Sequence, residues 1–485
     1  MNSGTSRGHT VETDDRQELL VQTSPARPSA VSIPELRAAV RGRVIAPGDP
    51  EYDTARSLFY GGMDRHPAAL VRVADSADVS RVVTLARDSG SDLAVRSGGH
   101  SSVGHSVWDS SIVVDLAELK GLDIDPSART AWAGTGLTAV EYSTSAAAHG
   151  LGTGFGDTGS VGIGGITLGG GVGYLARKHG LTIDSLLAAD VVTADGQLLR
   201  TDADNHPDLF WAIRGGGGNF GVATRFQYRL HDVSGFVGGM LMLPADANVV
   251  ASFIEAAEAA PEELTTIANV MPAPPMPFLP AEHYGRLVVM ALMAWTGNPE
   301  AGNRAMAPFR ALAEPIVDMV QAMPYPQIYP PEDVSYHPTA VGRTMFVDSM
   351  DRDVAATIVD YLEGSDASLR ATQLRVLGGA VSRVPAGATA YAHRASRIMV
   401  NLAAFYEGPE DRGVRDAWVA RFAAALRQGD EGAYVNFLND EGGDRVRAAY
   451  PGATWDRLSA IKARYDPTNL FHLNQNIPPA SMAAR

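Results

Sequence analysis

The first half of the chain carries a hydrophobic pattern that predicts a sheet of short strands. Apolar runs lie at residues 93–95 and 112–116, and residues 222–230 alternate apolar with polar side chains. Short apolar runs are typical of buried strands, and strict alternation is typical of a half-buried strand. Residues 76–89 instead place valines at helical spacing, which predicts a helix between the first strands.

After about residue 235 the pattern changes to helical stripes that alternate with strand-like runs. The stripes lie at residues 249–257, 298 onward, 354–362 and 414–426, and the strand-like runs lie at 287–295, 344–347, 372–377 and 398–406. Mixed helices and strands without an internal repeat predict an α+β cap. We expect the sheet of this cap to cover a cavity.

One glycine motif in the first half imitates a dinucleotide site. Gly134-Thr-Gly136-Leu-Thr-Ala139 fits the Rossmann fingerprint, with a strand before it and a helix after it. The fingerprint requires a parallel strand-helix-strand unit, whereas residues 122–125 and 130–133 form an antiparallel hairpin around a Pro-Ser turn. We therefore do not expect a nicotinamide cofactor here.

Three glycine-dense segments carry the candidate chemistry. Ser97-Gly98-Gly99 follows the run at 93–95 and leads directly into His100, which suggests an anion cradle with an imidazole beside it. Half of residues 150–173 are glycine, a composition that favours neither helix nor strand. Residues 215–221 lack the Gly-Lys-Ser/Thr ending of a nucleotide P-loop. A glycine-rich turn, an ordinary surface histidine and a flexible linker are the alternative interpretations.

Composition narrows the class of protein. A chain of 485 residues predicts two or three domains, and its net charge of -15 argues against nucleic acid or an anionic membrane as a partner. The chain has no cysteine, so it forms no disulfide and no thiolate metal site, and we predict no metal. Residues 1–30 are polar and predict a disordered tail. No run reaches the ~20 apolar residues of a membrane span, so we expect a soluble cytoplasmic protein.

Residues 91–230 and 430–478 resemble the bacterial berberine-bridge-enzyme-like branch of the vanillyl-alcohol oxidase/p-cresol methylhydroxylase flavoproteins, a branch that includes hydroxynicotine and sugar oxidases. Four motifs carry the resemblance: Arg96-Ser-Gly-Gly-His100, the glycine-dense loop from Thr158 to Gly171, Asp208-Leu-Phe-Trp-Ala-Ile-Arg-Gly-Gly-Gly-Gly-Asn-Phe-Gly-Val222, and the carboxyl-terminal set Tyr434-Val-Asn-Phe437, Tyr465-Asp-Pro-Thr-Asn-Leu-Phe and Leu473-Asn-Gln-Asn476-Ile-Pro.

The resemblance implies an α+β fold with an FAD-binding PCMH-type domain at residues 31–235. It further implies a substrate-binding domain with an antiparallel sheet and helices at 236–432, and a carboxyl-terminal segment at 433–485 that packs on the FAD domain. FAD would be bonded covalently to His100 alone, because Thr158 stands where doubly tethered relatives carry cysteine. The implied FAD-contacting residues are Arg96, Ser97, Gly98, Gly99, His100, Ser101, Thr158, Ser160, Val161, Gly162, Gly165, Leu168, Gly170, Val222, Asn474 and Asn476.

The resemblance also implies the catalytic candidates. Relatives use a tyrosine as proton acceptor, and Tyr434 is the candidate here, although Phe437 stands where the relatives often have a second tyrosine. Gln373 and Arg375 alternate on one predicted strand and are expected to face the flavin, where the cation would lower the pKa of a tyrosine. A core ring and a structural ion pair are the alternatives for Tyr434 and Arg375.

The implied reaction is an FAD-dependent oxidation of a small organic molecule. A hydride from an alcohol, amine or ring carbon would pass to flavin N5 and on to dioxygen, giving hydrogen peroxide. A small aliphatic side chain at Val161 favours dioxygen as the acceptor. A dehydrogenase with another acceptor and a catalytically inactive flavin-binding protein are the alternatives. The expected partners are dioxygen and a small organic substrate, a class that includes secondary metabolites. Monomer and homodimer are both compatible with the sequence.

Overall fold

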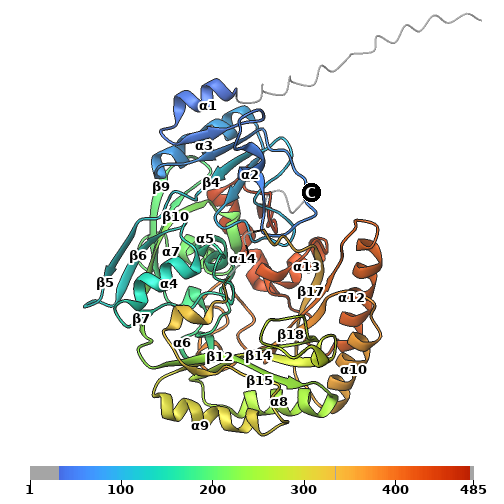
Figure 1. Cartoon of the computed structure of the whole chain (residues 1–485). Coiled ribbons are helices and arrows are strands. Elements are labelled where there is room, and N and C mark those ends of the chain that lie inside the picture. Colours follow the sequence, from blue (N-terminus) through green and yellow to red (C-terminus); the bar gives the residue numbers. More distant parts are fainter. Residues whose placement is uncertain (1–31, 332, 334, 481–485) are drawn as a thin grey trace, which may run out of the picture.

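The computed structural model describes residues 32–331, 333 and 335–480, whose strands form three larger sheets and a two-stranded ribbon (Figure 1). The tail expected at residues 1–30 lies outside the described residues. Strands up to residue 232 build the first two sheets, and strands from residue 236 to 405 build the third. The predicted domain boundaries at 235/236 and 432/433 stay predictions. None of the described helices combines the length and the apolar character that crossing a membrane requires.

The first sheet has the strand order β1-β2-β4-β3, in which β2 and β3 both run parallel to β4. The strands are β1 (Arg43–Ile45), β2 (Ala69–Arg72), β3 (Leu93–Arg96) and β4 (Ile112–Asp115), accompanied by α1 (Ile33–Ala39), α2 (Tyr52–Arg56) and α3 (Ser76–Ser89). The predicted helix at 76–89 is confirmed, and its valines are buried against the sheet. The loop that follows β3 carries His100.

The second sheet is antiparallel, with the order β5-β6-β10-β8-β9. Its strands are β5 (Leu122–Asp125), β6 (Thr130–Gly134), β8 (Leu186–Val192), β9 (Leu198–Asp202) and β10 (Val222–Arg229), and the ribbon pairs β7 (Leu151–Gly152) with β11 (His231–Asp232). Helix α4 (Ala139–Ala147) begins at a capping box formed by Thr138 and Glu141. Because β6 is antiparallel to both β5 and β10, no Rossmann unit forms at Gly134–Gly136, as expected.

The expectation that residues 150–173 avoid regular structure is wrong, because α5 (Ile163–Gly169) lies within this segment. Ile163 and Thr167 bury one side of this helix, and that packing offsets the conformational cost of its glycines. Gly164 has a steric reason to be glycine, since a Cβ there would lie 2.9 Å from Ser97 Oγ. The glycines therefore allow a helix to pack against the loop that contains Ser97.

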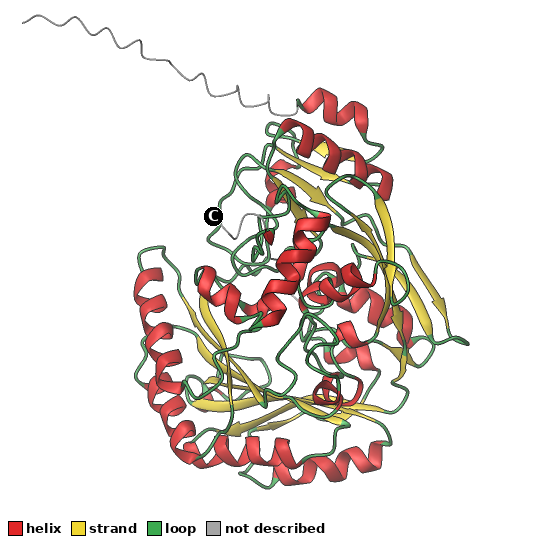
Figure 2. Ribbon diagram, turned by 180° about the vertical axis from the view of Figure 1, so that it is seen from behind, coloured by secondary structure: helices red, strands yellow, loops and turns green. Residues whose placement is uncertain are grey.

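The third sheet has eight strands and is covered by helices on one face (Figure 2). Its strands are β12 (Phe236–Pro244), β13 (Leu264–Pro272), β14 (Leu287–Thr296), β15 (Val317–Asp318), β16 (Gln321–Ala322), β17 (Ala340–Val347), β18 (Arg370–Val376) and β19 (Ile398–Phe405). The covering helices are α8 (Ala247–Ala259), α9 (Pro299–Arg310), α10 (Arg352–Glu363) and α12 (Arg412–Leu426). These helices and the four predicted strands are confirmed, whereas β12 and β13 were not predicted.

The remaining helices lie between these strands or follow the last of them. They are α6 (Ala176–His179), η1 (Thr182–Asp184), α7 (Pro207–Ala212), η2 (Gly217–Asn219), η3 (Ala281–His283), η4 (Tyr325–Ile328), α11 (Ala380–Arg383), η5 (Val435–Phe437), α13 (Gly443–Ala448) and α14 (Ala453–Tyr465). The final helix, α14, packs against α7 and returns the chain to the first half of the molecule.

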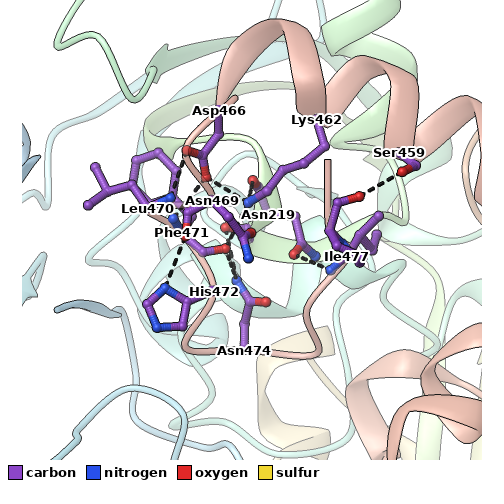
Figure 3. A network of polar contacts seen from close by, with 12 residues as sticks. Asn219, Ser459, Lys462, Asp466, Asn469, Leu470, Phe471, His472, Asn474 and Ile477 are labelled. Atoms are coloured by element: carbon purple, nitrogen blue, oxygen red, sulfur yellow. Dashed lines mark hydrogen bonds and ion pairs between the residues drawn. The ribbon is translucent and has the colours of Figure 1, made fainter. Parts of the chain in front are cut away.

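A buried ion pair fixes the carboxyl-terminal segment in place (Figure 3). Lys462 and Asp466 are fully buried and lie 2.6 Å apart. Lys462 Nζ also donates to the carbonyls of Asn219 (2.7 Å) and Phe471 (2.9 Å). Burial lowers the pKa of Lys462, and Asp466 counters that effect. The ammonium group thus joins the loop of η2 to the segment that follows α14.

We predict that Lys462→Met lowers the free energy of unfolding by about 3–5 kcal/mol, because the Asp466 carboxylate remains buried without its cation. Urea denaturation measures this change. Arg464→Met on the same helix is the matched control, since Arg464 is 63% exposed and its pair with Asp208 is a surface pair. The control is expected to cost less than about 1 kcal/mol. Equal losses in the two variants would contradict the prediction.

Candidate active site

A cavity of about 490 Å³ lies where the three chain regions meet. The first half of the molecule lines it with residues from segments 95–106, 156–172 and 217–223. The inner face of the third sheet contributes Gln373, Arg375 and Asn401, and the carboxyl-terminal segment contributes residues 434–439 and 474–475. Its volume is typical of a small-molecule or cofactor site.

Two glycine loops touch at the floor of the cavity. A Cβ on Gly98 would lie 2.2 Å from the backbone nitrogen of Gly162, and a Cβ on Gly162 would lie 2.2 Å from that of Gly98. Ser97 Oγ donates to the carbonyl of Thr135 (2.6 Å) and accepts from Gly164 N–H (3.3 Å). At Gly165, which lines the cavity, a Cβ would meet no atom within 4 Å. The loops therefore form a cradle of bare backbone.

His100 lines the same cavity and is held by two contacts. Its Nε2 lies 2.7 Å from Ser160 Oγ, in the second glycine loop. Its ring stacks on Phe59, with 4.2 Å between ring centroids and 22° between planes. Phe59 is in turn anchored, because its backbone N–H donates to the carbonyl of Gly99. The imidazole is thus oriented before any ligand binds.

Most of the expected FAD-contacting residues line the cavity, and four do not. Those that line it are Ser97, Gly98, Gly99, His100, Ser101, Thr158, Val161, Gly162, Gly165, Leu168, Val222 and Asn474. Among the described residues, Arg96 is missing from the lining because neighbouring strand residues face opposite sides, and its guanidinium donates to the carbonyl of Ala55. Ser160 contacts His100 instead, Gly170 packs on the Tyr434 ring, and Asn476 is the fourth residue that does not line the cavity.

Asn474 and Asn476 each have a side-chain oxygen with no protein partner in the part of the chain that the structure describes. Asn474 Nδ2 donates to the carbonyls of Gly218 (3.3 Å) and Phe471 (3.2 Å), which fixes the orientation of the amide (Figure 3). Asn474 Oδ1 and Asn476 Oδ1 are buried, and neither has a hydrogen-bond partner among the described residues. An unpaired buried acceptor is unfavourable, so a ligand N–H is the expected partner of Asn474, which lines the cavity, whereas Asn476 does not line it. Bare glycine backbone and the Asn474 acceptor fit the diphosphate and the polar ring edge of a flavin dinucleotide.

Tyr434 points its hydroxyl at a turn of the second glycine loop. The phenol oxygen accepts hydrogen bonds from the backbone N–H groups of Gly171 (2.9 Å) and Val172 (3.3 Å) and from Asn436 Nδ2 (2.9 Å). Burial raises the pKa of Tyr434, while these donors and Arg375 act in the opposite direction. The three donors would therefore stabilise the phenolate form, whereas burial would make that phenolate a strong base.

Gln373 and Arg375 lie on one face of β18, as predicted, and their side chains are hydrogen-bonded to each other. Arg375 Nη2 donates to Gln373 Oε1 (2.7 Å) and forms an ion pair with Asp157 Oδ2 (2.5 Å). Arg375 Nη1 donates to the carbonyl of Val172 (2.8 Å), and the guanidinium carbon lies 5.2 Å from the centre of the Phe437 ring. Arg375 thus connects the third sheet to the second glycine loop.

The cavity residues that sequence reasoning did not predict include Asp157, Tyr60 and His105. Asp157 sits in Gly-Asp-Thr-Gly, which is typical of an ordinary turn, and only its place before Thr158 could have indicated a role. His105 is buried, and burial lowers its pKa to about 4. His393 is buried and does not line the cavity.

Comparison with known proteins supports this geometry. A family model described as "FAD binding domain" matches residues 67–202, and one described as "Berberine and berberine like" matches residues 433–478. The chain is 29% identical over 469 residues to (R)-6-hydroxynicotine oxidase of Paenarthrobacter nicotinovorans, covering 91% of this chain and 97% of the relative. It is 30% identical over 479 residues to xylooligosaccharide oxidase of Thermothelomyces thermophilus, covering 90% and 93%.

A solved structure of a relative has a similar fold. The crystal structure of 6-hydroxy-D-nicotine oxidase from Arthrobacter nicotinovorans superposes with a TM-score of 0.79 at 26% identity, covering 90% of this chain and 98% of that one. The protein is an FAD-linked oxidoreductase with mixed α and β structure. The chain belongs to the berberine-bridge-enzyme-like family, and it is an oxidase of small organic molecules.

We predict that Gly98→Ala lowers the free energy of unfolding by about 1–3 kcal/mol and reduces the FAD bound per chain, because the added Cβ meets backbone that cannot move aside. Thermal unfolding and the ratio of flavin to protein absorbance measure the two effects. Gly413→Ala is the control, because a Cβ there would meet nothing within 4 Å. A Gly98→Ala protein with full flavin content and unchanged stability would contradict the requirement for glycine at this point of the cradle.

Proposed function

We propose that the protein oxidises an alcohol, amine or ring carbon of a small organic molecule, with FAD tethered to His100 and dioxygen as the final acceptor, giving hydrogen peroxide. The observation that carries this proposal is that one cavity holds the His100 loop, Tyr434 and the pair of Gln373 and Arg375. FAD, when bound, supplies a two-electron acceptor for the substrate hydride. The names of two relatives, a hydroxynicotine oxidase and a xylooligosaccharide oxidase, support small organic substrates.

In this proposal Tyr434 accepts the proton that leaves the substrate O–H or N–H group. Its oxygen is surrounded by three donors, which stabilise the phenolate that must be present before the proton moves. Gln373 holds the Arg375 guanidinium through its amide oxygen, so the cation keeps a fixed position relative to Tyr434. Val161 lines the cavity, and its small side chain supports access for dioxygen.

The tether has a direct test. We predict that the denatured wild-type chain stays yellow and gains the mass of one FAD, whereas His100→Ala releases its flavin into acid. Mass spectrometry of the denatured chain measures the bond independently of activity. His66→Ala is the control, because that histidine side chain is 57% exposed, and it is expected to keep the tether. A wild-type chain that releases all its flavin would overturn this part of the proposal.

The oxidase activity is tested by anaerobic mixing with benzyl alcohol, benzylamine, xylobiose and 6-hydroxynicotine. We expect at least one of these compounds to bleach the flavin, and we expect air to restore the colour with one hydrogen peroxide per turnover. Reduced flavin that persists in air but is reoxidised by an artificial dye would instead indicate a dehydrogenase. Bleaching by none of the four would contradict the substrate classes proposed here.

Tyr434→Phe is expected to slow flavin reduction by roughly 10²–10⁴-fold, the usual contribution of a positioned general base. Because burial raises the pKa of Tyr434, the phenol stays protonated at neutral pH and the basic form grows as pH rises. The wild-type rate should therefore increase from pH 7 to 9, and the variant rate should be flat. Stopped-flow reduction across this range gives both profiles, and parallel profiles would exclude Tyr434 as the base.

A further inference from the structure

The wall of the cavity contains one negative and one positive side chain. Among the described residues that line it, Asp157 and Arg375 are the only members of the Asp, Glu, Lys and Arg group. His105 adds no charge at neutral pH, because burial lowers its pKa to about 4. Among the Asp, Glu, Lys and Arg side chains of the cavity wall, a charged substrate would therefore encounter this one pair.

Protein groups accept from four of the five N–H groups of Arg375. Its Nε and Nη2 both donate to Gln373 Oε1, its Nη1 donates to the carbonyl of Val172, and its Nη2 also donates to Asp157. The side chain is 3% exposed. The guanidinium is therefore largely shielded from an anion that enters the cavity.

Asp157 is the more accessible member of the pair. Its side chain is 21% exposed, against 3% for Arg375. Its Oδ2 accepts from Arg375 and, at 3.4 Å, from Gln373 Nε2, whereas its Oδ1 accepts one long hydrogen bond of 3.4 Å from Thr158. The exposed part of the pair is thus a carboxylate, which attracts donors and cations and repels anions.

We propose that Asp157 selects substrates by their charge. Because it neutralises Arg375 and faces the cavity, it restricts binding to uncharged or cationic molecules and excludes carboxylates and other anions. This inference rests on the proposed function, because it places the oxidised molecule in this cavity. Asp157 acts from the second glycine loop upon a residue 218 positions further along the chain. Without the carboxylate, Arg375 would be an uncompensated cation in a small, buried space.

Sulfite is the probe, because it is a small anion that reacts with bound flavin and bleaches its visible absorbance. Holoenzymes of the wild type, Asp157→Asn, Arg375→Gln and the double variant are titrated with sulfite at constant pH. A neighbouring charge shifts ionic equilibria by about one to three log units, so we expect Asp157→Asn to bind sulfite at least roughly tenfold more tightly. Arg375→Gln should bind it at least roughly tenfold more weakly, and the double variant should return toward the wild type.

Asp190→Asn is the matched control, since Asp190 pairs with Arg200 and Arg225 on the second sheet and does not line the cavity. Its sulfite affinity is expected to equal that of the wild type. Sulfite affinity that is unchanged or weakened in Asp157→Asn, or bleaching in none of the proteins, would overturn the inference. If Asp157→Asn does not fold, the Arg375→Gln titration decides alone, with unchanged affinity counting against the proposal.

The two proposals fail in different ways. A wild type that oxidises one of the four test compounds, while Asp157→Asn shows no gain in sulfite affinity, contradicts only the role of Asp157. If none of the four compounds reduces the flavin of the wild type, while the sulfite affinities follow the expected order, the result contradicts the proposed oxidation. The inferred role of Asp157 in the charge of the cavity then stands.

Discussion

The backbone contact between Gly98 and Gly162 is the constraint on which the rest of the site depends. A Cβ on either residue would lie 2.2 Å from the other residue's backbone nitrogen, and such an overlap cannot be relieved by rotating a side chain. The contact joins a loop that leaves β3 to the loop that begins α5. Because these loops touch, His100 comes within 2.7 Å of Ser160 and the floor of the cavity has a single arrangement. The glycines are therefore required by packing as well as by the approach of a ligand.

The other two regions of the cavity are attached to the same loops by polar contacts. Tyr434 accepts from the backbone at Gly171 and Val172, and Arg375 donates to the carbonyl of Val172 from the sheet above. On the opposite side, Lys462 joins Asn219 to the segment that carries Asn474 (Figure 3). Tyr434 and Arg375 are thus anchored to one short stretch of chain, Gly171 and Val172, whereas the segment of Asn474 is anchored to the loop of η2. A displacement of the second glycine loop would move Tyr434 and Arg375 together.

The sequence predicted the parts of this structure that have a periodic or motif signal. Helix α3 and the helices over the third sheet follow from apolar spacing, and the glycine motifs located the cradle and His100. Helix α5 was missed because its stability comes from burying Ile163 and Thr167, which composition does not reveal. Strand β12 contains two adjacent glycines, which hide its strand pattern. Asp157 could not be predicted, since its partner Arg375 lies 218 residues away and a single aspartate in a turn has no distinctive pattern.

Arg375 lowers the pKa of Tyr434 less than burial raises it. The guanidinium also forms an ion pair with the Asp157 carboxylate 2.5 Å away. Burial is the largest influence, and the pKa of Tyr434 stays above its ordinary value. A group with a raised pKa is deprotonated rarely but is a strong base when it is, so the three hydrogen bonds to the phenol oxygen become the main support for its anion. The reactivity of Tyr434 therefore depends on the backbone of the glycine loop.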